Sequence, residues 1–464
     1  PPGEGRYGES FQGLAGMMGS EIDPRLGRRQ ILTLMGLGGA AAGAGLLLPR
    51  RGIASARMSG KGVRIVIAGA GAGAAGLTAA SKLTQRLDGA DITIIDARTA
   101  HYYQPGFTLV AGGIKPKEYV TSATADHLAS GVKWIQDSVA EFDPDGNKVV
   151  TASGKSVPYD FLVVATGLHL DYAAVEGMDT SRIGQDGLGS IYAGPDAAHA
   201  TWGAMSAFAD KGGVGLFLRP NTEMKCAGAP LKYTFLTDDH LRRRGNRGKA
   251  EIIYAANNKA LFSVPIVSEK VRMLFRDRDV KVRYDHVPTG IDLGRKTAAF
   301  STLNGPSEIK YDFINVIPPM RAPQAVRNSP LRWQDGVFAA DGWMEVDKAT
   351  LRHKRYPNVF GVGDVAGVPK GKTAASVKWQ VPVAVDHLVA SVAGTQATSA
   401  YNGYTSCPLI TRLGQAMLVE FDYDNNLAPS FPKVIAPLEE LWITWVMKTM
   451  ALKPTYLAML HGQA

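Results

Sequence analysis

A glycine-rich loop between an apolar segment and a helix-forming segment is the feature that most constrains the fold. Residues 62–68 carry a run of Val and Ile typical of a buried strand, and the following loop has the spacing Gly71-x-Gly73-x-x-Gly76. In such a loop the first glycine makes a tight turn and the second lets backbone amides approach a pyrophosphate. The third lets the helix pack closely on the strand. The loop therefore predicts a dinucleotide-binding βαβ unit.

The register of this loop is open to two interpretations, because Gly69 also supplies a glycine. The register that begins at Gly71 is preferred. In that register Asp96 follows the last glycine by about 20 residues, at the end of a second apolar strand, residues 92–95. An acidic residue at this place accepts a hydrogen bond from a ribose hydroxyl. The order strand, glycine loop, helix, strand and acidic residue therefore predicts one nucleotide-binding site.

Two further segments have the pattern of a strand that ends in a turn of small residues. Residues 159–167 end in Ala-Thr-Gly, and residues 358–364 end in Gly-Asp. In this order after the glycine loop, the pair resembles the fingerprints of two-domain FAD-linked flavoproteins related to the disulfide reductases. In those proteins the aspartate contacts the ribityl and pyrophosphate region of FAD. The resemblance therefore implies FAD as the cofactor.

A second glycine loop, which NADH-using members of that superfamily carry in the inserted domain, is missing from the sequence. The corresponding strand, residues 215–218, leads into residues 219–230, which contain prolines and bulky side chains. A pyrophosphate needs bare backbone at this place. We therefore expect the flavin to be reduced by something other than a nicotinamide.

Several longer segments resemble the sulfide:quinone oxidoreductases, and most of all the branch that includes the mitochondrial enzymes. The resemblance extends from residue 62 to the end of the chain. It is carried by residues 101–105, 225–230, 356–361, 372–375, 403–409 and 420–423. It implies an α/β fold with two Rossmann-type, FAD/NAD(P)-binding-like domains and an amphipathic C-terminal helical tail. It also implies an enzyme in which sulfide, or a related small sulfur donor, reduces FAD and a membrane quinone takes the electrons.

The resemblance also implies which residues form the site. Those that would line FAD are Gly71, Gly73, Gly76, Asp96, Gln104, Val139, Thr166, Gly167, Gly363 and Asp364. Lys372 would lie at the pyrimidine edge of the flavin, where a fixed positive charge stabilises the anionic reduced form. The alternative for Lys372 is a surface lysine that caps a helix. Phe421 and Tyr423 would offer aromatic faces to the quinone.

Cys226 is the residue expected to handle sulfur beside the flavin, because only a thiolate attacks a disulfide or accepts sulfane sulfur. We expect the neighbouring Lys225 to lower the pKa of this thiol. The alternative for Cys226 is a small buried hydrophobe. Cys407, the second of two cysteines in the chain, is interpreted as buried, inert and well separated from the redox site.

One position departs from the family pattern. The second redox cysteine is expected directly after the Gly-Asp fingerprint, where this chain has Val365. Valine cannot hold a persulfide or close a disulfide. Three outcomes follow: Cys226 acts alone with an external thiol or sulfide as its partner, the enzyme oxidises a different sulfur compound, or the lineage has lost sulfide oxidation.

The first 56 residues have the layout of an export signal. Arg28 and Arg29 precede a soft apolar run, residues 35–48, and an Ala-Ser-Ala cleavage site at 54–56. The apolar run is shorter than the roughly 20 residues that a bilayer span needs. The pattern predicts twin-arginine export and a peripheral position at the periplasmic side of the membrane. The alternatives are a Gly/Ala-rich leader and an uncleaved anchor.

The C-terminal stretch 434–464 mixes aromatic residues, methionines and aliphatic residues with spaced lysines. Pro454 is expected to divide it into two short helices that lie in a membrane interface. The alternative is an apolar helix pair packed on the protein or on a second copy. The expected division of the chain is a leader at 1–56, an FAD domain at 57–167 and 318–400, a second Rossmann-like domain with Cys226 at 168–317, and a membrane-docking region at 401–464.

Charge and residue spacing exclude other classes of partner. The net charge is +9, but no basic cluster carries interleaved aromatic residues, so nucleic acid is not expected. The cysteines and histidines lack the spacing of a metal site. Two alternative functions stay open: a flavoprotein that donates electrons to cytochrome c, as flavocytochrome c sulfide dehydrogenases do, and an FAD-binding subunit with reduced catalysis. A second copy of the chain or a cytochrome is left open as a further partner.

Overall fold

The computed structural model describes residues 57–69 and 73–464, and Arg57–Ala464 forms one compact unit. The twin-arginine pattern and Gly71 lie outside the described residues. Because the two predicted Rossmann-type domains belong to one compact unit, their boundaries at 167, 317 and 400 stay predictions.

The three predicted fingerprints follow strands of one five-stranded parallel sheet. Its order is β22-β11-β2-β4-β7. The strands are β2 (Arg64–Ala68), β4 (Asp91–Ile95), β7 (Lys133–Ile135), β11 (Phe161–Val164) and β22 (Val359–Gly361). Because parallel strands end at the same edge of a sheet, the segments that follow β2, β11 and β22 meet there. An antiparallel sheet of β8 (Val139–Asp143), β9 (Lys148–Thr151) and β10 (Ser156–Pro158) accompanies this one.

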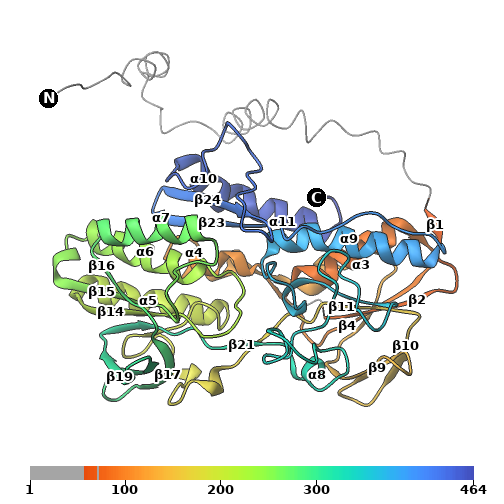
Figure 1. The fold of residues 1–464 in the computed structure, drawn as a ribbon, viewed down its shortest axis with the longest axis horizontal. Helices are drawn as coiled ribbons and strands as arrows, with labels where there is room; N and C mark the ends of the chain where they lie inside the picture. The colour runs from red at the N-terminus through yellow and green to blue at the C-terminus, as the bar shows by residue number, and fades with distance from the viewer. Residues whose placement is uncertain (1–56, 70–72) are drawn as a thin grey trace, which may run out of the picture. The chain divides into compact units, whose positions relative to one another are not determined.

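Two long helices cover this sheet. Helix α3 (Ala74–Arg86) begins directly after Gly73, and α9 (Ala374–Val392) packs beside it (Figure 1). Helix α9 begins at Ala374 because the side chain of Thr373 accepts a hydrogen bond from the backbone N–H of Ser376, which satisfies one of the free donors of the first turn.

A second five-stranded parallel sheet lies in the other half of the view in Figure 1. Its order is β13-β20-β14-β15-β16. The strands are β13 (Leu188–Gly189), β14 (Gly213–Leu218), β15 (Ala250–Ala255), β16 (Val280–Arg283) and β20 (Phe313–Asn315). The helices are α5 (Pro195–Lys211), α6 (Ala229–Arg243) and α7 (Pro265–Asp277). An antiparallel sheet of β17 (Val287–Asp292), β18 (Thr297–Thr302) and β19 (Gly305–Lys310) adjoins.

Short elements connect these layers. They are β1 (Met58–Ser59) with β3 (Leu87–Asp88), β5 (Ala100–Tyr102) with β6 (Thr121–Ala123), β12 (His169–Leu170) with β21 (Met320–Arg321), and the helices α4 (Phe107–Ala111) and α8 (Gln324–Arg327). The repeated parallel α/β arrangement agrees with the predicted fold class.

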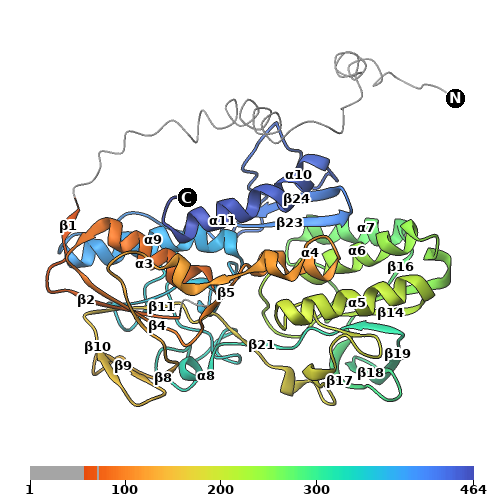
Figure 2. The same ribbon diagram turned by 180° about the vertical axis from the view of Figure 1, so that it is seen from behind.

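The C-terminal region crosses from one Rossmann-type unit to the other. The hairpin of β23 (Thr405–Arg412) and β24 (Gln415–Phe421) packs against both α6 and α9. Figure 2 shows the last helices lying over α3. Through this hairpin, residues of the helices on the second sheet come close to the carboxyl edge of the first sheet.

The tail is one helical run rather than two pieces. Helix α10 (Trp442–Val446) continues through a π-helical turn at Met447–Ala451 into α11 (Leu452–Leu460). The expectation that Pro454 divides the tail is therefore wrong. Pro454 stands in the first turn of α11, where its missing N–H is tolerated, and the irregular turn comes before it. Across residues 57–69 and 73–464, no helix is both long and apolar enough to span a bilayer.

Candidate active site

Cys226 has a backbone conformation that most residues avoid. Its φ is 48°, in the left-handed region, and its N–H donates to the carbonyl of Lys372 at 2.9 Å. A non-glycine residue in this region costs on the order of 1 kcal/mol, and such residues cluster at functional sites. Cys226 lies just before α6, whose first turn contains Pro230. The strain is a structural reason, independent of sequence pattern, to regard Cys226 as functional.

Cys407 is the thiol that faces Cys226. It is 4% exposed on β23, it lines the same cavity as Cys226, and each of the two thiols shifts the pKa of the other. A Cβ atom on Gly228 would come within 2.4 Å of the Cys407 sulfur, so Gly228 is the residue that lets the two segments approach. The prediction that Cys407 is buried is confirmed, and the prediction that it is well separated from the redox site is wrong. The β23–β24 hairpin brings it there by packing on α6.

Two buried lysines surround the thiols. Lys232 of α6 donates to the Cys226 sulfur at 3.4 Å, and Lys448 of the π-helical turn donates to the carbonyl of Pro105 at 2.6 Å. Both side chains are at most 2% exposed. The neighbouring Cys407 thiol holds the pKa of Cys226 well below its ordinary value, and the charges of Lys232 and Lys448 add to this against the effect of burial. The Cys407 thiol and the two lysines therefore favour a thiolate at Cys226.

Lys232 and Lys448 have the larger effect on the pKa of Cys226, and Lys225, which also interacts with it by charge, has a smaller part than its position in the sequence suggests. Its ammonium donates to the Gln104 side-chain oxygen at 2.7 Å. The ammonium that bonds the Cys226 thiol is that of Lys232, because α6 turns it back toward the loop. Lys232 could have been suspected from its place in the first turns of the helix after Cys226, whereas no sequence signal reveals Lys448.

The charge of Lys448 depends on its surroundings. Burial lowers its pKa to about 7, the nearby Lys232 lowers it too, and the two cysteines oppose both effects. Lys232 behaves differently: burial lowers its pKa, but the two thiols outweigh burial and raise it above the ordinary value. Lys232 is thus the permanent positive charge beside the thiols.

Lys372 is buried, so the alternative of a surface lysine is wrong. It is 5% exposed, and its ammonium donates to the carbonyls of Asp364 and Ala366 at 2.8 and 3.0 Å. The same ammonium lies 3.6 Å from the centre of the Trp343 ring. Burial lowers the pKa of Lys372 to about 8, and the carboxylates of Glu223, Asp364 and Asp341 oppose this. Lys372 therefore brings a buried positive charge to the end of the β22 fingerprint.

The carboxyl edge of the first sheet has the open backbone that a dinucleotide needs. A Cβ atom added to Gly73 or to Gly167 would meet no atom within 4 Å, and Gly167 has φ 69°. The buried hydroxyl of Thr166 has no hydrogen-bond partner among the residues that the structure describes. Gly363 has φ 77°, and its N–H donates to Gln380 at 2.8 Å. These residues fit the predicted FAD, with open space and an available hydroxyl at two of the three loops.

The other predicted FAD residues lie on the same unit. Gly76 is buried in the first turn of α3, Asp96 directly follows β4, and Val139 begins β8. The Asp96 carboxylate accepts the backbone N–H of Arg98 at 2.8 Å. Burial raises the pKa of Asp364, and Lys225 and Lys372 oppose the shift. The contact of each of these residues with FAD stays a prediction.

A cavity of about 140 Å³ contains both thiols. Its lining includes Cys226, Cys407, Lys372, Phe421, Phe262 and Lys370. The rings of Phe421 and Phe262 meet edge to face with centroids 5.6 Å apart. Tyr423 is not part of this lining: its hydroxyl donates to the carbonyl of Lys348 at 2.9 Å, and its ring packs on Tyr401. The structure therefore brings Phe421 to the thiols and leaves Tyr423 outside the cavity.

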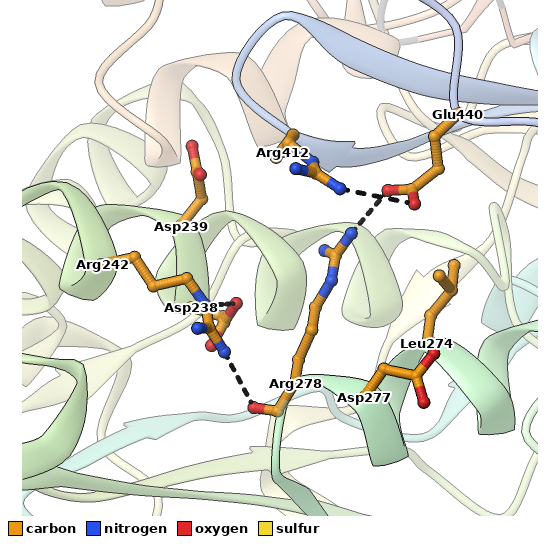
Figure 3. Close-up of a pocket in the computed structure, with 8 residues that line it drawn as sticks. All are labelled: Asp238, Asp239, Arg242, Leu274, Asp277, Arg278, Arg412 and Glu440. Carbon is orange, nitrogen blue, oxygen red and sulfur yellow. Dashed lines mark hydrogen bonds and ion pairs between the residues drawn. The ribbon is translucent and has the colours of Figure 1, made fainter.

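A larger cavity, of about 310 Å³, lies between α6, α7 and the C-terminal region (Figure 3). Its charged groups pair with one another, including Arg278 with Glu440 and Arg242 with Asp238. None of the residues predicted for the site lines it. The ion pairs that line this cavity fasten the C-terminal segment to the helices of the second sheet.

Comparison with known proteins places the chain in a family. Residues 63–194 match the family described as Pyridine nucleotide-disulphide oxidoreductase. The mitochondrial sulfide:quinone oxidoreductase of Mus musculus is 38% identical over 365 residues, which cover 78% of this chain and 79% of that protein. The chain belongs to the sulfide:quinone oxidoreductase family.

Two further relatives agree with this assignment. The mitochondrial sulfide:quinone oxidoreductase of Dictyostelium discoideum is 37% identical over 370 residues, which cover 80% of each chain. The crystal structure of the sulfide:quinone oxidoreductase from the hyperthermophilic bacterium Aquifex aeolicus superposes with a TM-score of 0.71 at 21% identity, over 86% of this chain and 92% of that one. The predicted family and its two-domain α/β fold are thus confirmed.

Proposed function

We propose that this chain is an FAD-dependent sulfide:quinone oxidoreductase whose redox pair is Cys226 and Cys407. The observation that carries the proposal is that the two thiols line one cavity together with the buried Lys372. Membership of the family supplies the substrate classes, sulfide and quinone. The open backbone at Gly73 and Gly167 supports FAD as the cofactor, as does the Thr166 hydroxyl, which has no hydrogen-bond partner among the described residues.

The proposed cycle starts from the oxidised pair, in which Cys226 and Cys407 share a sulfur–sulfur bond. Hydrosulfide attacks one sulfur of that bond, which becomes a persulfide, and the bond's electron pair leaves with the other cysteine as a thiolate. A thiolate or hydrosulfide acceptor then attacks the outer sulfur of the persulfide, and the cysteine that held it leaves as a second thiolate. Closure of the two thiolates to the sulfur–sulfur bond releases two electrons, which a bound FAD would accept and pass to quinone.

Three lysines place positive charge where this cycle forms negative charge. Lys232 and Lys448 stabilise the departing thiolate, since both side chains are buried beside the thiols, where charges interact strongly. Lys372 holds positive charge at the end of the Gly-Asp fingerprint, as the predicted position beside the flavin requires. Phe421 and Phe262 add an apolar wall to the cavity.

Val365 does not prevent this cycle. The sequence pattern led us to expect the second cysteine at that position, but Cys407 of β23 provides a thiol at the same site from a different part of the chain. Neither a single-cysteine mechanism nor a different sulfur substrate is therefore needed. The loss of sulfide oxidation, the third outcome, is the one that experiment has to exclude.

The exposed apolar residues of the C-terminal region support the proposal that the protein docks on the membrane that holds the quinone. Four of its large apolar side chains are strongly exposed: Val434 at 71%, Trp442 at 66%, Met450 at 51% and Ile443 at 45%. Such residues enter the interface of a bilayer without spanning it. The twin-arginine pattern supports a periplasmic position of this peripheral enzyme, whereas the relatives above are mitochondrial by name.

An anaerobic stopped-flow experiment tests the proposal. The FAD-loaded protein is mixed with sulfide while flavin absorbance is followed, and decylubiquinone is then added. We expect bleaching by sulfide, none by NADH, and recovery with quinone. Cys226→Ser and Cys407→Ser should each abolish bleaching. Absence of bleaching in the unmodified protein at millimolar sulfide would refute sulfide as the substrate.

A further inference from the structure

A cluster of histidines and tyrosines lies on the far side of the loop that carries Gln104. Strand β5 pairs with β6 so that His101 stands opposite Ser122, and the 3-10 turn Thr124–His127 follows at once. Helix α11 adds Tyr456, and His461 comes directly after that helix. Segments from two distant parts of the chain thus assemble one row of groups that can carry protons.

The row is connected by short contacts. The Nε2 atom of His101 lies 2.8 Å from the hydroxyl of Tyr456, and the Nε2 atom of His127 lies 2.8 Å from the hydroxyl of Ser122. The rings of His101 and His127 have centroids 5.0 Å apart, and those of His127 and His461 5.7 Å. One bridging water is enough to span ring separations of this size.

The outer residue of the row is exposed, and the other three are buried. His461 is exposed, whereas His127, His101 and Tyr456 are 6%, 1% and 5% exposed. The outer end therefore meets solvent, and the inner end does not. Such an arrangement is what a route for protons into a closed site requires.

Two polar atoms of this cluster lack partners among the described residues. They are the Nδ1 atom of His127 and the hydroxyl of Tyr103, both buried. An unsatisfied buried polar group costs about 1–3 kcal/mol, so packing alone does not favour it. The free Nδ1 leaves His127 able to take a proton from one neighbour and pass one on.

The inner end of the row reaches the proposed active site. The ring of Tyr456 packs edge to face on Tyr103, with centroids 4.9 Å apart, and Gln104 follows with its bond to Lys225. Tyr456 is also close enough to Asp364 for that carboxylate to contribute to its raised pKa, after the larger effect of burial. Asp364 belongs to the fingerprint expected to contact FAD.

We propose that His461, His127, His101 and Tyr456 form a proton path from solvent to the site where quinone is reduced. The proposal rests on the proposed function. Reduction of one quinone to a quinol consumes two electrons and two protons. Both electrons and one proton come from the anionic reduced flavin, and the second proton has to come from water. In the path, Tyr456 gives its proton inward and recovers one from His101.

Burial and the neighbouring charges favour a neutral imidazole at His127. His127 faces His461, Asp126 and Lys453, and its pKa is lowered by burial first, and then by the charge of His461. Tyr456 faces His101, Tyr103 and Asp364. A neutral imidazole can accept a proton at one nitrogen and release one from the other.

The test separates the two half-reactions in the full-length, FAD-loaded protein. The flavin is reduced by light rather than by sulfide and mixed with decylubiquinone, while flavin absorbance and a pH-indicator dye are recorded together. Tyr456→Phe keeps the ring and removes the hydroxyl, and His127→Gln keeps a bond to Ser122 but cannot carry a proton. We expect each variant to slow proton uptake by about 10-fold or more. Bleaching by sulfide should keep the unmodified rate.

Tyr159→Phe is the matched control, because the Tyr159 hydroxyl is also buried without a partner among the described residues but lies outside the cluster. It should leave both half-reactions unchanged. Histidine NMR with 15N labelling gives a readout besides activity: Tyr456→Phe should change the His101 signals and spare those of His353.

The outcomes are distinct from those of the proposed function. Proton uptake at the unmodified rate in both Tyr456→Phe and His127→Gln, from about pH 6 to about pH 9, would overturn the path. Equal slowing of both half-reactions would also overturn it, since that indicates a structural role. Failure of sulfide to bleach the unmodified protein would instead refute the proposed function, because photoreduction still reports on the path.

Discussion

The thiols of Cys226 and Cys407 line one cavity and shift each other's pKa, although one residue precedes α6 and the other lies on β23. The contact joins the second Rossmann-type unit to the C-terminal hairpin. Gly228 makes it possible, because any larger residue would collide with the Cys407 sulfur. The redox pair is therefore a product of packing between distant segments.

Replacement of Cys407 tests whether this pair is one functional unit. Cys407→Ser should remove reduction of the flavin by sulfide as completely as Cys226→Ser does, because either change leaves no second sulfur to close the bridge. Ser406→Ala, one position away on the same strand, is the control and should bleach normally. Flavin absorbance after mixing with sulfide is the measurement. A Cys407→Ser variant that still turned over would show that Cys226 acts alone.

Lys232 and Lys225 can be distinguished by the titration of Cys226. Because the Lys232 ammonium helps to lower the pKa of Cys226, Lys232→Met should raise that pKa and move the alkylation of Cys226 to higher pH. Lys225→Met should move it less, since that ammonium bonds Gln104. The rate of iodoacetamide labelling at Cys226, followed by mass spectrometry over a range of pH, is the measurement. A larger effect of Lys225→Met would contradict the assignment to Lys232.

The ion pair in Figure 3 is expected to fasten the C-terminal segment. The Arg278 and Glu440 side chains are 10% and 18% exposed, so Glu440→Gln leaves a mostly buried guanidinium without its carboxylate. We expect the segment to lose about 2 kcal/mol, which makes amide hydrogen exchange in α10 about 30-fold faster. Glu269→Gln removes the partner of Arg272 from an exposed pair and should change exchange by less than about 3-fold.

The same pair should depend on pH in a defined direction. Burial raises the pKa of Glu440, but the neighbouring Thr411 side chain and the charges of Arg278 and Arg412 outweigh it and lower the pKa below 4.5. Its contribution is therefore complete above pH 4.5 and is lost as the pH falls through the lowered folded-state pKa. The unmodified protein and Glu440→Gln should then exchange α10 amides at the same rate. A difference between them that persisted at lower pH would refute this origin.

Binding to membranes should depend on the exposed apolar residues of the tail. Trp442→Ser should weaken association with lipid vesicles by about 10-fold, because a large apolar side chain no longer leaves water. Leu303→Ser is the matched control: it is 79% exposed, but it lies between β18 and β19, at the opposite edge of the view from α10 (Figure 1). Cosedimentation with vesicles is the measurement. Equal weakening by both changes would argue against docking through the tail.

The sequence by itself determined the parts of this protein that depend on local backbone. A nucleotide-binding edge is predicted by three glycines that each follow an apolar strand: Gly73, Gly167 and Gly363. A pyrophosphate can approach the backbone only where it is free of side chains. Cys226 belongs to this group, since its family segment is continuous in sequence. The family and its two-domain fold followed from these segments.

Only the tertiary structure decided which groups share the site. Cys407 and Lys448 reach Cys226 because β23 packs on α6 and a π-helical turn carries Lys448 inward, and neither event leaves a local pattern. The sequence instead pointed to Val365 and Lys225, the nearest positions along the chain. Distance along a chain and distance in space differ most where a late hairpin closes over an earlier domain, since side-chain packing across many residues, rather than backbone preference, sets that contact.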